Sequence, residues 1–204
     1  MRRGAFPPEF YLRPAEEVAP DLLGADLVST VDGSLTVGRI VEVEAYVGPH
    51  DPASHAAERI GRTARNATMF GGPGVAYVYR IYGLHWCLNA VTGEEGYPAA
   101  VLIRALEPLE GLDVMRRRRA AEARAGERRP LADRDLARGP ARLAQALGIT
   151  GALDGHPLDR APLLIRPGVP LPAERIVAGP RVGITRAAEW PLRFSVRGSP
   201  WVSR

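Results

Sequence analysis

The segment 35–46 (Leu-Thr-Val-Gly-Arg-Ile-Val-Glu-Val-Glu-Ala-Tyr) constrains the fold more than any other part of the chain. Side chains of a β-strand alternate between its two faces. The valines at 37, 41 and 43 share one face with Ala45, whereas Glu42, Glu44 and Tyr46 share the other. The apolar face predicts a strand packed on a core. The acidic face lines either solvent or a pocket, and the strand alone leaves both possibilities open.

Two β-hairpins are predicted from short turns between apolar runs. Asp32-Gly33 separates residues 27–31 from 35–46, and Tyr82-Gly83 separates residues 75–81 from 84–91. Glycine reaches positive φ without steric strain, as many two-residue turns require. The second turn places Tyr82 at an exposed tip, and an aromatic ring in such a place indicates a role in binding.

The remaining elements follow from periodicity and from helix start and stop signals. We expect helices over 15–23, 107–125 and 139–147, and strands over 99–106, 163–165 and 193–201. Residues 47–74 form a long connection rich in Gly and Pro, a length that is typical of functional loops. Arg104 lies inside an apolar run, where a charge needs a partner.

The length of 204 residues suits one large domain that buries its own core. No apolar run approaches the roughly 20 residues that span a bilayer, and residues 1–8 lack the apolar core of a signal peptide. We therefore expect a cytoplasmic protein. Cys87 is the only cysteine, so it forms no disulfide within the chain, and we expect a buried thiol in an apolar strand.

All 27 basic residues are arginines, and the net charge is +4. A basic surface attracts polyanions, of which nucleic acid is the commonest. Without lysine there is no side-chain amine for Schiff-base chemistry, and arginine stays protonated in proteins. A lysine nucleophile is therefore excluded.

Three functions are compatible with these residues. Glu42, Glu44, Asp51 and His55 could hold a divalent metal, as in a metal-dependent nuclease. Alternatively, Glu44 activates water without a metal, while Tyr46 and Tyr79 enclose a flat ring. In this interpretation Arg104 orients the carboxylate or a phosphate, and Tyr82 fills the gap left by an extruded base. The third possibility is a non-enzymatic binder of damaged or flipped bases.

The succession of motifs resembles the alkyladenine (3-methyladenine or methylpurine) DNA glycosylases. The matching stretches are Gly38–Pro49, His55, Arg65-Asn66, Met69-Phe70, Tyr77–Gly83, Asn89, Leu102–Gly111, Gly139-Pro140 and Glu189–Ser203. The likeness spans nearly the whole chain, in order, and is far more specific than any single motif.

The resemblance implies a single mixed α/β (α+β) domain over residues 1–204, with a curved antiparallel β-sheet, a protruding β-hairpin and surrounding helices. It implies a monofunctional DNA glycosylase of base excision repair that flips damaged purines (3-methyladenine, 7-methylguanine, ethenoadenine, hypoxanthine) out of duplex DNA. Hydrolysis of the N-glycosidic bond then leaves an abasic site. The implied partner is double-stranded DNA carrying a damaged purine, and we expect a monomer without metal or other cofactor.

The resemblance also assigns roles to residues of this sequence. Glu44 is the general base, and Arg104 and the carbonyl of Val196 hold the attacking water. The base pocket is formed by Tyr46, Ala53, His55, Tyr79, Asn89 and Leu102, with the two tyrosines stacking on the base, His55 bonding its edge and Asn89 rejecting guanine. The DNA contacts are Tyr82 as the minor-groove wedge, Thr63, Arg65, Met69, Tyr77, Gly139 and Arg142.

Overall fold

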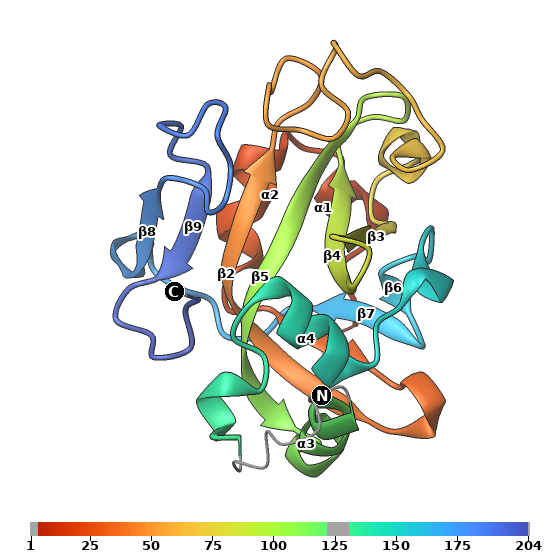
Figure 1. Ribbon diagram of the computed structural model, residues 1–204. Coiled ribbons are helices and arrows are strands. Elements are labelled where there is room, and N and C mark those ends of the chain that lie inside the picture. The colour runs from red at the N-terminus through yellow and green to blue at the C-terminus, as the bar shows by residue number, and fades with distance from the viewer. Residues whose placement is uncertain (1–3, 122–130, 204) are drawn as a thin grey trace.

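The computed structural model describes residues 4–121 and 131–203. Its centre is a curled antiparallel sheet with the strand order β3-β4-β5-β2-β1-β7-β6 (Figure 1). These strands are β1 (Asp26–Ser29), β2 (Thr36–Tyr46), β3 (Ala76–Ile81), β4 (His85–Thr92), β5 (Ala99–Glu110), β6 (Asp159–Arg160) and β7 (Leu163–Arg166). The predicted mixed α/β domain around a curved antiparallel sheet is confirmed, and its extent over residues 1–204 stays a prediction.

The longest strands, β2 and β5, pair with each other and form the spine of the sheet. The other edge of β2 is covered by β1 over its first part and by β9 (Arg193–Val196) over its second part, and β8 (Ile176–Gly179) pairs with β9. Register shifts on either side of Glu42 mark irregular pairing, which bends and twists a strand. Glu42 and Glu44 on the acidic face of β2 are both fully buried, so a solvated face is excluded for them.

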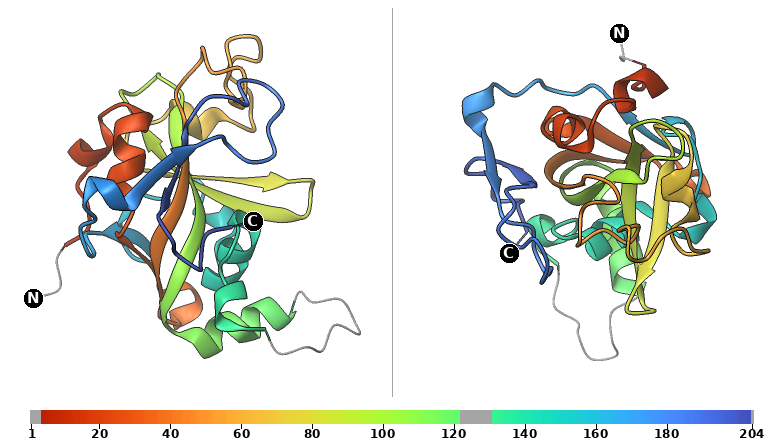
Figure 2. Two further views of the ribbon diagram at one scale, coloured as in Figure 1. Left: turned by 90° about the vertical axis from the view of Figure 1, so that its left-hand side faces the viewer. Right: turned by 90° about the horizontal axis from the view of Figure 1, so that it is seen from above.

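Four α-helices of the described residues surround the sheet: α1 (Pro8–Tyr11), α2 (Ala15–Leu22), α3 (Leu112–Ala121) and α4 (Pro140–Leu147). α2 packs on β2, and α4 packs on β4 and β5. The two helices lie on opposite sides of the sheet (Figures 1 and 2). As predicted, α4 begins with Pro140 and ends at Gly148, whose φ of 72° is the left-handed conformation that favours glycine after a helix.

The hairpin of β3 and β4 projects from the body of the protein (Figure 2, left). Tyr82 and Gly83 form its turn with φ angles of 53° and 69°. Tyr82 is 85% exposed, and Leu84 beside it is 71% exposed. The predicted tip is therefore confirmed, and it places two apolar side chains in solvent.

The predicted helix over 107–125 is wrong at its start. The strand β5 runs on to Glu110, and α3 begins only at Leu112. Gly111 separates them with a φ of 77°, and a Cβ there would lie 2.2 Å from the Leu35 carbonyl oxygen. Glu107 and Glu110 are therefore strand residues. Residues 122–125 of the predicted helix lie outside the described residues.

Smaller differences concern the ends of elements. β1 stops at Ser29 because residues 31–33 form a 3₁₀ turn, and β9 stops at Val196, short of the predicted 201. The short helix α1 was not predicted. Cys87 is buried in β4, as expected. None of the described helices is long and apolar enough to cross a membrane.

Candidate active site

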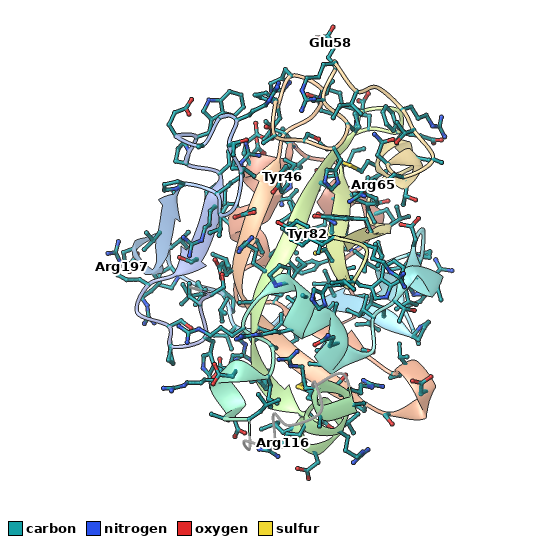
Figure 3. All side chains as sticks on the ribbon, in the orientation of Figure 1. Tyr46, Glu58, Arg65, Tyr82, Arg116 and Arg197 are labelled. Carbon is teal, nitrogen blue, oxygen red and sulfur yellow. The ribbon has the colours of Figure 1, made fainter. Side chains whose placement is uncertain are left out.

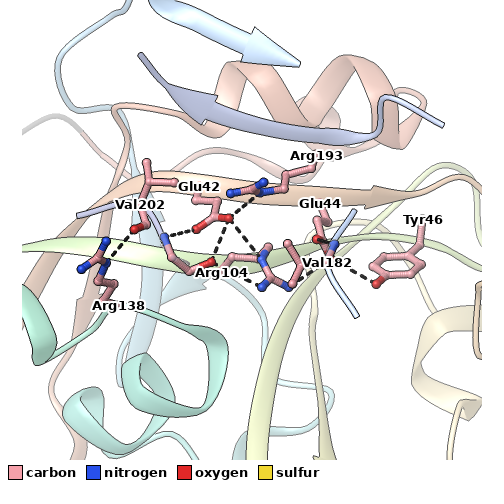
Figure 4. A network of polar contacts seen from close by, with 9 residues as sticks. Glu42, Glu44, Tyr46, Arg104, Arg138, Val182, Arg193 and Val202 are labelled. Carbon is pink, nitrogen blue, oxygen red and sulfur yellow. Dashed lines mark hydrogen bonds and ion pairs between the residues drawn. The ribbon is translucent and has the colours of Figure 1, made fainter. Parts of the chain in front are cut away.

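Glu44 lies on β2 with its carboxyl group fully buried. Its Oε1 accepts a hydrogen bond from the N–H of Val182 at 2.6 Å, and its Oε2 accepts one from the hydroxyl of Tyr46 at 3.2 Å. Arg104 of β5 brings Nη1 to 3.2 Å from Oε2. Figure 4 shows these partners converging on the carboxylate from three segments of the chain.

Burial raises the pKa of Glu44 above its ordinary value, and the nearby charge of Glu42 acts in the same direction. Arg104, the N–H of Val182 and the hydroxyl of Tyr46 stabilise the carboxylate and oppose this rise. The result is a buried carboxylate that is more basic than a glutamate in water. Such a group is suited to accept a proton near neutral pH.

Glu42 is also buried, and it holds Arg104 in place. Its Oε1 lies 3.3 Å from Arg104 Nε and 2.6 Å from Arg193 Nε. The N–H and the hydroxyl of Ser203 donate to the same carboxylate at 2.6 and 2.9 Å. Arg104 therefore bridges Glu42 and Glu44, which confirms that the charge in the apolar run of β5 has partners (Figure 4).

A cavity of about 160 Å³ lies beside this network. Tyr46, Arg104 and Val182, the three partners of Glu44, all line it. Its remaining lining comes from the 47–74 loop, the hairpin, β5, the start of α4 and a C-terminal loop: Ala53, Ser54, His55, Met69, Tyr77, Tyr79, Ile81, Cys87, Asn89, Leu102, Pro140, Gly183 and Ile184. The six residues predicted for the base pocket are thus brought together around one cavity.

Apart from Arg104, the titratable side chains that line the cavity carry no charge at neutral pH. Burial, followed by the charge of Arg65, lowers the pKa of His55, so its imidazole is neutral. Burial raises the pKa of Tyr77 to about 12 and that of the Cys87 thiol to about 11. The ring of Tyr77 stacks on that of Tyr79, with centroids 5.2 Å apart, and its hydroxyl lies 3.3 Å from His55 Nδ1. The cavity is therefore an aromatic slot whose titratable groups are neutral except for Arg104, through which it meets the charged network.

Asn89 and Leu102 are paired across β4 and β5 and line the cavity. Asn89 is buried, and its amide Nδ2 donates to the carbonyl of Tyr77 at 3.0 Å. This bond fixes the orientation of the Asn89 side chain from within the hairpin. A polar group of fixed orientation is a means of discriminating between flat ligands.

The predicted DNA contacts divide into exposed and buried residues. Arg65 donates to the carbonyl of Arg80 at 3.0 Å, and Thr63 donates its N–H to Asn66 at 2.6 Å. Figure 3 shows Tyr82, Arg65 and Tyr46 in the same part of the molecule. Gly139 precedes α4, and Arg142 lies half-exposed on its first turn, 3.9 Å from Asp135. By contrast, Met69 and Tyr77 are buried and reach only the cavity.

Val196 is not brought to the cavity. It lies on β9 opposite Ile176 and lines a different hollow, together with Arg39 and Trp201. The main-chain group that contacts the Glu44 carboxylate is instead the N–H of Val182. The Pro-rich run before Arg181 contains no periodic pattern, so the sequence offered no register by which to place Val182 against β2.

The metal alternative finds no support in the geometry. Asp51 forms a fully buried ion pair with Arg181, and Glu42 and Glu44 both face Arg104. Within residues 4–121 and 131–203, no three His, Cys, Asp or Glu side chains form a group that could hold a metal ion.

Comparison with known proteins agrees with this geometry. The family model of methylpurine-DNA glycosylase (MPG) matches residues 9–200. The chain belongs to the methylpurine-DNA glycosylase family. It is 53% identical over 195 residues to a protein of Rhodopseudomonas palustris (strain BisB18) named "Putative 3-methyladenine DNA glycosylase", covering 96% of this chain and 88% of the relative. A protein of the same name from Methanoculleus marisnigri is 53% identical over 201 residues, covering 97% and 98%.

Replacing Glu42 and replacing Glu44 are expected to change the free energy of unfolding by different amounts. Because the pKa of Glu44 is raised, its contribution to the free energy of unfolding decreases as the pH rises from 4.5 through the raised value. At pH 7, Glu44→Gln should therefore leave stability unchanged or increase it. Glu42→Gln leaves two arginines short of a counter-charge and should destabilise by roughly 3 kcal/mol. Urea unfolding of both variants measures the difference, and an equal loss in both would contradict it.

Proposed function

We propose that the protein flips alkylated purines out of duplex DNA and hydrolyses their N-glycosidic bond with a water molecule that Glu44 deprotonates. The reaction leaves an abasic site and begins base excision repair. The observation that carries the proposal is the buried, basic carboxylate of Glu44, whose partners Tyr46, Arg104 and Val182 line an aromatic cavity. Membership of the methylpurine-DNA glycosylase family supports the same class of reaction, the hydrolysis of an N-glycosyl bond.

The aromatic residues supply the energy of base flipping. Extruding a base costs a few kcal/mol of stacking and pairing. Stacking on an aromatic side chain returns about 1–3 kcal/mol per base. Tyr46 and Tyr79 line the cavity and stack on the extruded base, while Tyr82 at the hairpin tip fills the space that the base has left.

The charged network supplies the chemistry. As the bond between C1′ and the purine nitrogen breaks, its electron pair leaves with the purine and the sugar acquires oxocarbenium character. The negative charge of Glu44 stabilises this cation, and Glu44 takes the proton of the water whose oxygen bonds to C1′. Arg104, held by Glu42, lowers the pKa of Glu44 against the effect of burial and so favours its ionised form.

The neutral cavity favours a particular class of substrate. Purines alkylated at a ring nitrogen, such as 3-methyladenine and 7-methylguanine, carry positive charge and leave without protonation. His55, Tyr77 and Cys87 offer no acidic proton at neutral pH, because burial holds each in its neutral form. The aromatic walls also accept ethenoadenine and hypoxanthine, while Asn89 disfavours the exocyclic amine of undamaged guanine. 7-Methylguanine carries the same amine, but its positive charge weakens the N-glycosidic bond enough for it to remain a substrate. Since one chain supplies all walls of the site, we propose that the enzyme acts as a monomer.

The direct test is base release from duplex DNA containing one 7-methylguanine, ethenoadenine or hypoxanthine, in the presence of a chelator. Wild-type protein should produce abasic sites, and Glu44→Gln should lose this activity while keeping its affinity for DNA. Glu16→Gln, an exposed position on α2, serves as a matched control and should behave as wild type. Binding without base release by the wild type would identify a damage binder, and chelator-sensitive nicking would identify a nuclease.

Tyr82→Ala should weaken flipping in duplex DNA. Loss of a stacking side chain worth about 1–3 kcal/mol predicts a decrease in single-turnover base release from duplex DNA of roughly 5- to 150-fold. Release from a single strand with the same lesion should change much less, because no duplex gap has to be filled. Leu109→Ala removes another exposed apolar side chain, at the far end of β5, and is the control. Equal losses on both DNA forms would place Tyr82 elsewhere in the mechanism.

A further inference from the structure

Residues 181–190 form a loop without regular secondary structure, which we call the C-terminal wall. Val182, Gly183 and Ile184 of this wall line the cavity. Most of its residues are exposed or partly exposed, and Arg181 alone is buried, with 4% of its surface exposed. Trp190 at the end of this wall packs on the hydrophobic core, whereas at its start the wall is attached to β2 by the hydrogen bonds of Arg181 and Val182.

Arg181 is bound on several sides. Its Nη1 and Nη2 donate to the two carboxylate oxygens of Asp51 at 2.5 and 2.9 Å, and Nη1 also donates to the carbonyl of Ala45 at 3.0 Å. Two parallel bonds between a guanidinium and a carboxylate fix direction as well as distance. The C-terminal wall is therefore joined to β2 and to the loop after it by one buried residue.

The same ion pair holds the opposite side of the cavity. Asp51 also accepts the N–H of Ala53 at 3.0 Å, and Ala53 lines the cavity. The guanidinium carbon of Arg181 lies 4.8 Å from the centroid of the Tyr46 ring, within the range of a cation–π contact. Arg181 thus contacts the ring that is proposed to stack on the flipped base.

We propose that Arg181 is a positioning residue, whose ion pair with Asp51 holds the N–H of Val182 against Glu44 and fixes the ring of Tyr46 at the cavity. This inference rests on the proposed function and adds to it the residue that organises the general base. Val182 follows Arg181 directly in the chain and donates to Glu44 Oε1 at 2.6 Å. Movement of Arg181 must therefore move this donor.

The influence of Arg181 on Glu44 passes through Val182. The groups that face the Glu44 carboxyl are Arg104 from β5, Glu42 and Tyr46 from β2, and the N–H of Val182, while Arg193 of β9 is directed at Glu42. The guanidinium of Arg181 is instead occupied by Asp51 and the carbonyl of Ala45. A hydrogen bond to a carboxylate favours its charged form, so loss of the Val182 bond raises the pKa of Glu44 further.

The test uses Arg181→Lys, which keeps a positive charge for Asp51 but cannot form the same parallel bonds. Arg197→Lys is the matched control, because Arg197 is an exposed arginine whose Nε donates to the carbonyl of Glu174. Figure 3 shows Arg197 at the edge of the molecule, away from Tyr46. Two quantities are measured: the ¹³C NMR titration of the Glu44 carboxyl, assigned with Glu44→Gln, and the single-turnover rate constant for 7-methylguanine release at saturating enzyme, which is insensitive to an unfolded fraction.

Arg181→Lys should move the Glu44 midpoint to higher pH and lower the rate constant on the order of 100-fold, with unchanged affinity for DNA. Arg197→Lys should match wild type in both. An unchanged Glu44 midpoint in Arg181→Lys would overturn the positioning role, because a purely structural arginine affects only folding. The NMR result does not depend on catalysis. A shifted Glu44 midpoint in Arg181→Lys, together with no base release by the wild-type protein, would refute the proposed function and leave the positioning role supported.

Discussion

The structure depends on two carboxylates and one guanidinium buried between β2 and β5. Glu42 and Glu44 point to the same side of β2, where Arg104 bridges them. Burying one such charge alone costs several kcal/mol, and the cost is tolerable only with close partners. The sheet provides these partners: β5 brings Arg104, and β9 brings Arg193 to the outer side of Glu42. Glu42 neutralises the arginines, so Glu44 remains surrounded by partners and yet more basic than a glutamate in water.

In the rest of the site, the charged side chains and the aromatic side chains occupy different places. The network of Glu42, Glu44 and Arg104 carries the charges, whereas the rest of the cavity lining is aromatic, apolar or neutral. The two parts meet at Tyr46, which lines the cavity and donates its hydroxyl to Glu44. In the proposed reaction, a flat ring is recognised by stacking and by fixed polar groups, while one carboxylate takes the proton. The projecting hairpin places Tyr82 outside the cavity, where its side chain is exposed to solvent.

Local patterns in the sequence predicted much of this arrangement. The alternation along β2 placed Glu44 and Tyr46 on one face, and the Tyr82-Gly83 turn gave the exposed tip. The alternation did not decide between solvent and interior, because that depends on β9, which is about 150 residues away in the chain. For the same reason the sequence did not predict the contacts of Arg181 and Val182 with β2. Both residues are far from β2 in the chain and lie in a loop without periodicity. The role predicted for Val196 came from a motif match, and the structure places that residue at another hollow.

The central claim is that a single buried carboxylate of raised pKa is the base of the reaction. The pH dependence of single-turnover 7-methylguanine release tests it most directly, because this cationic base needs no proton to leave. The rate should fall as the pH decreases through a midpoint above 4.5, the ordinary value for glutamate, while circular dichroism shows the protein still folded. A rate that stays constant down to pH 4.5, or an acidic fall that persists in Glu44→Gln, would contradict the account.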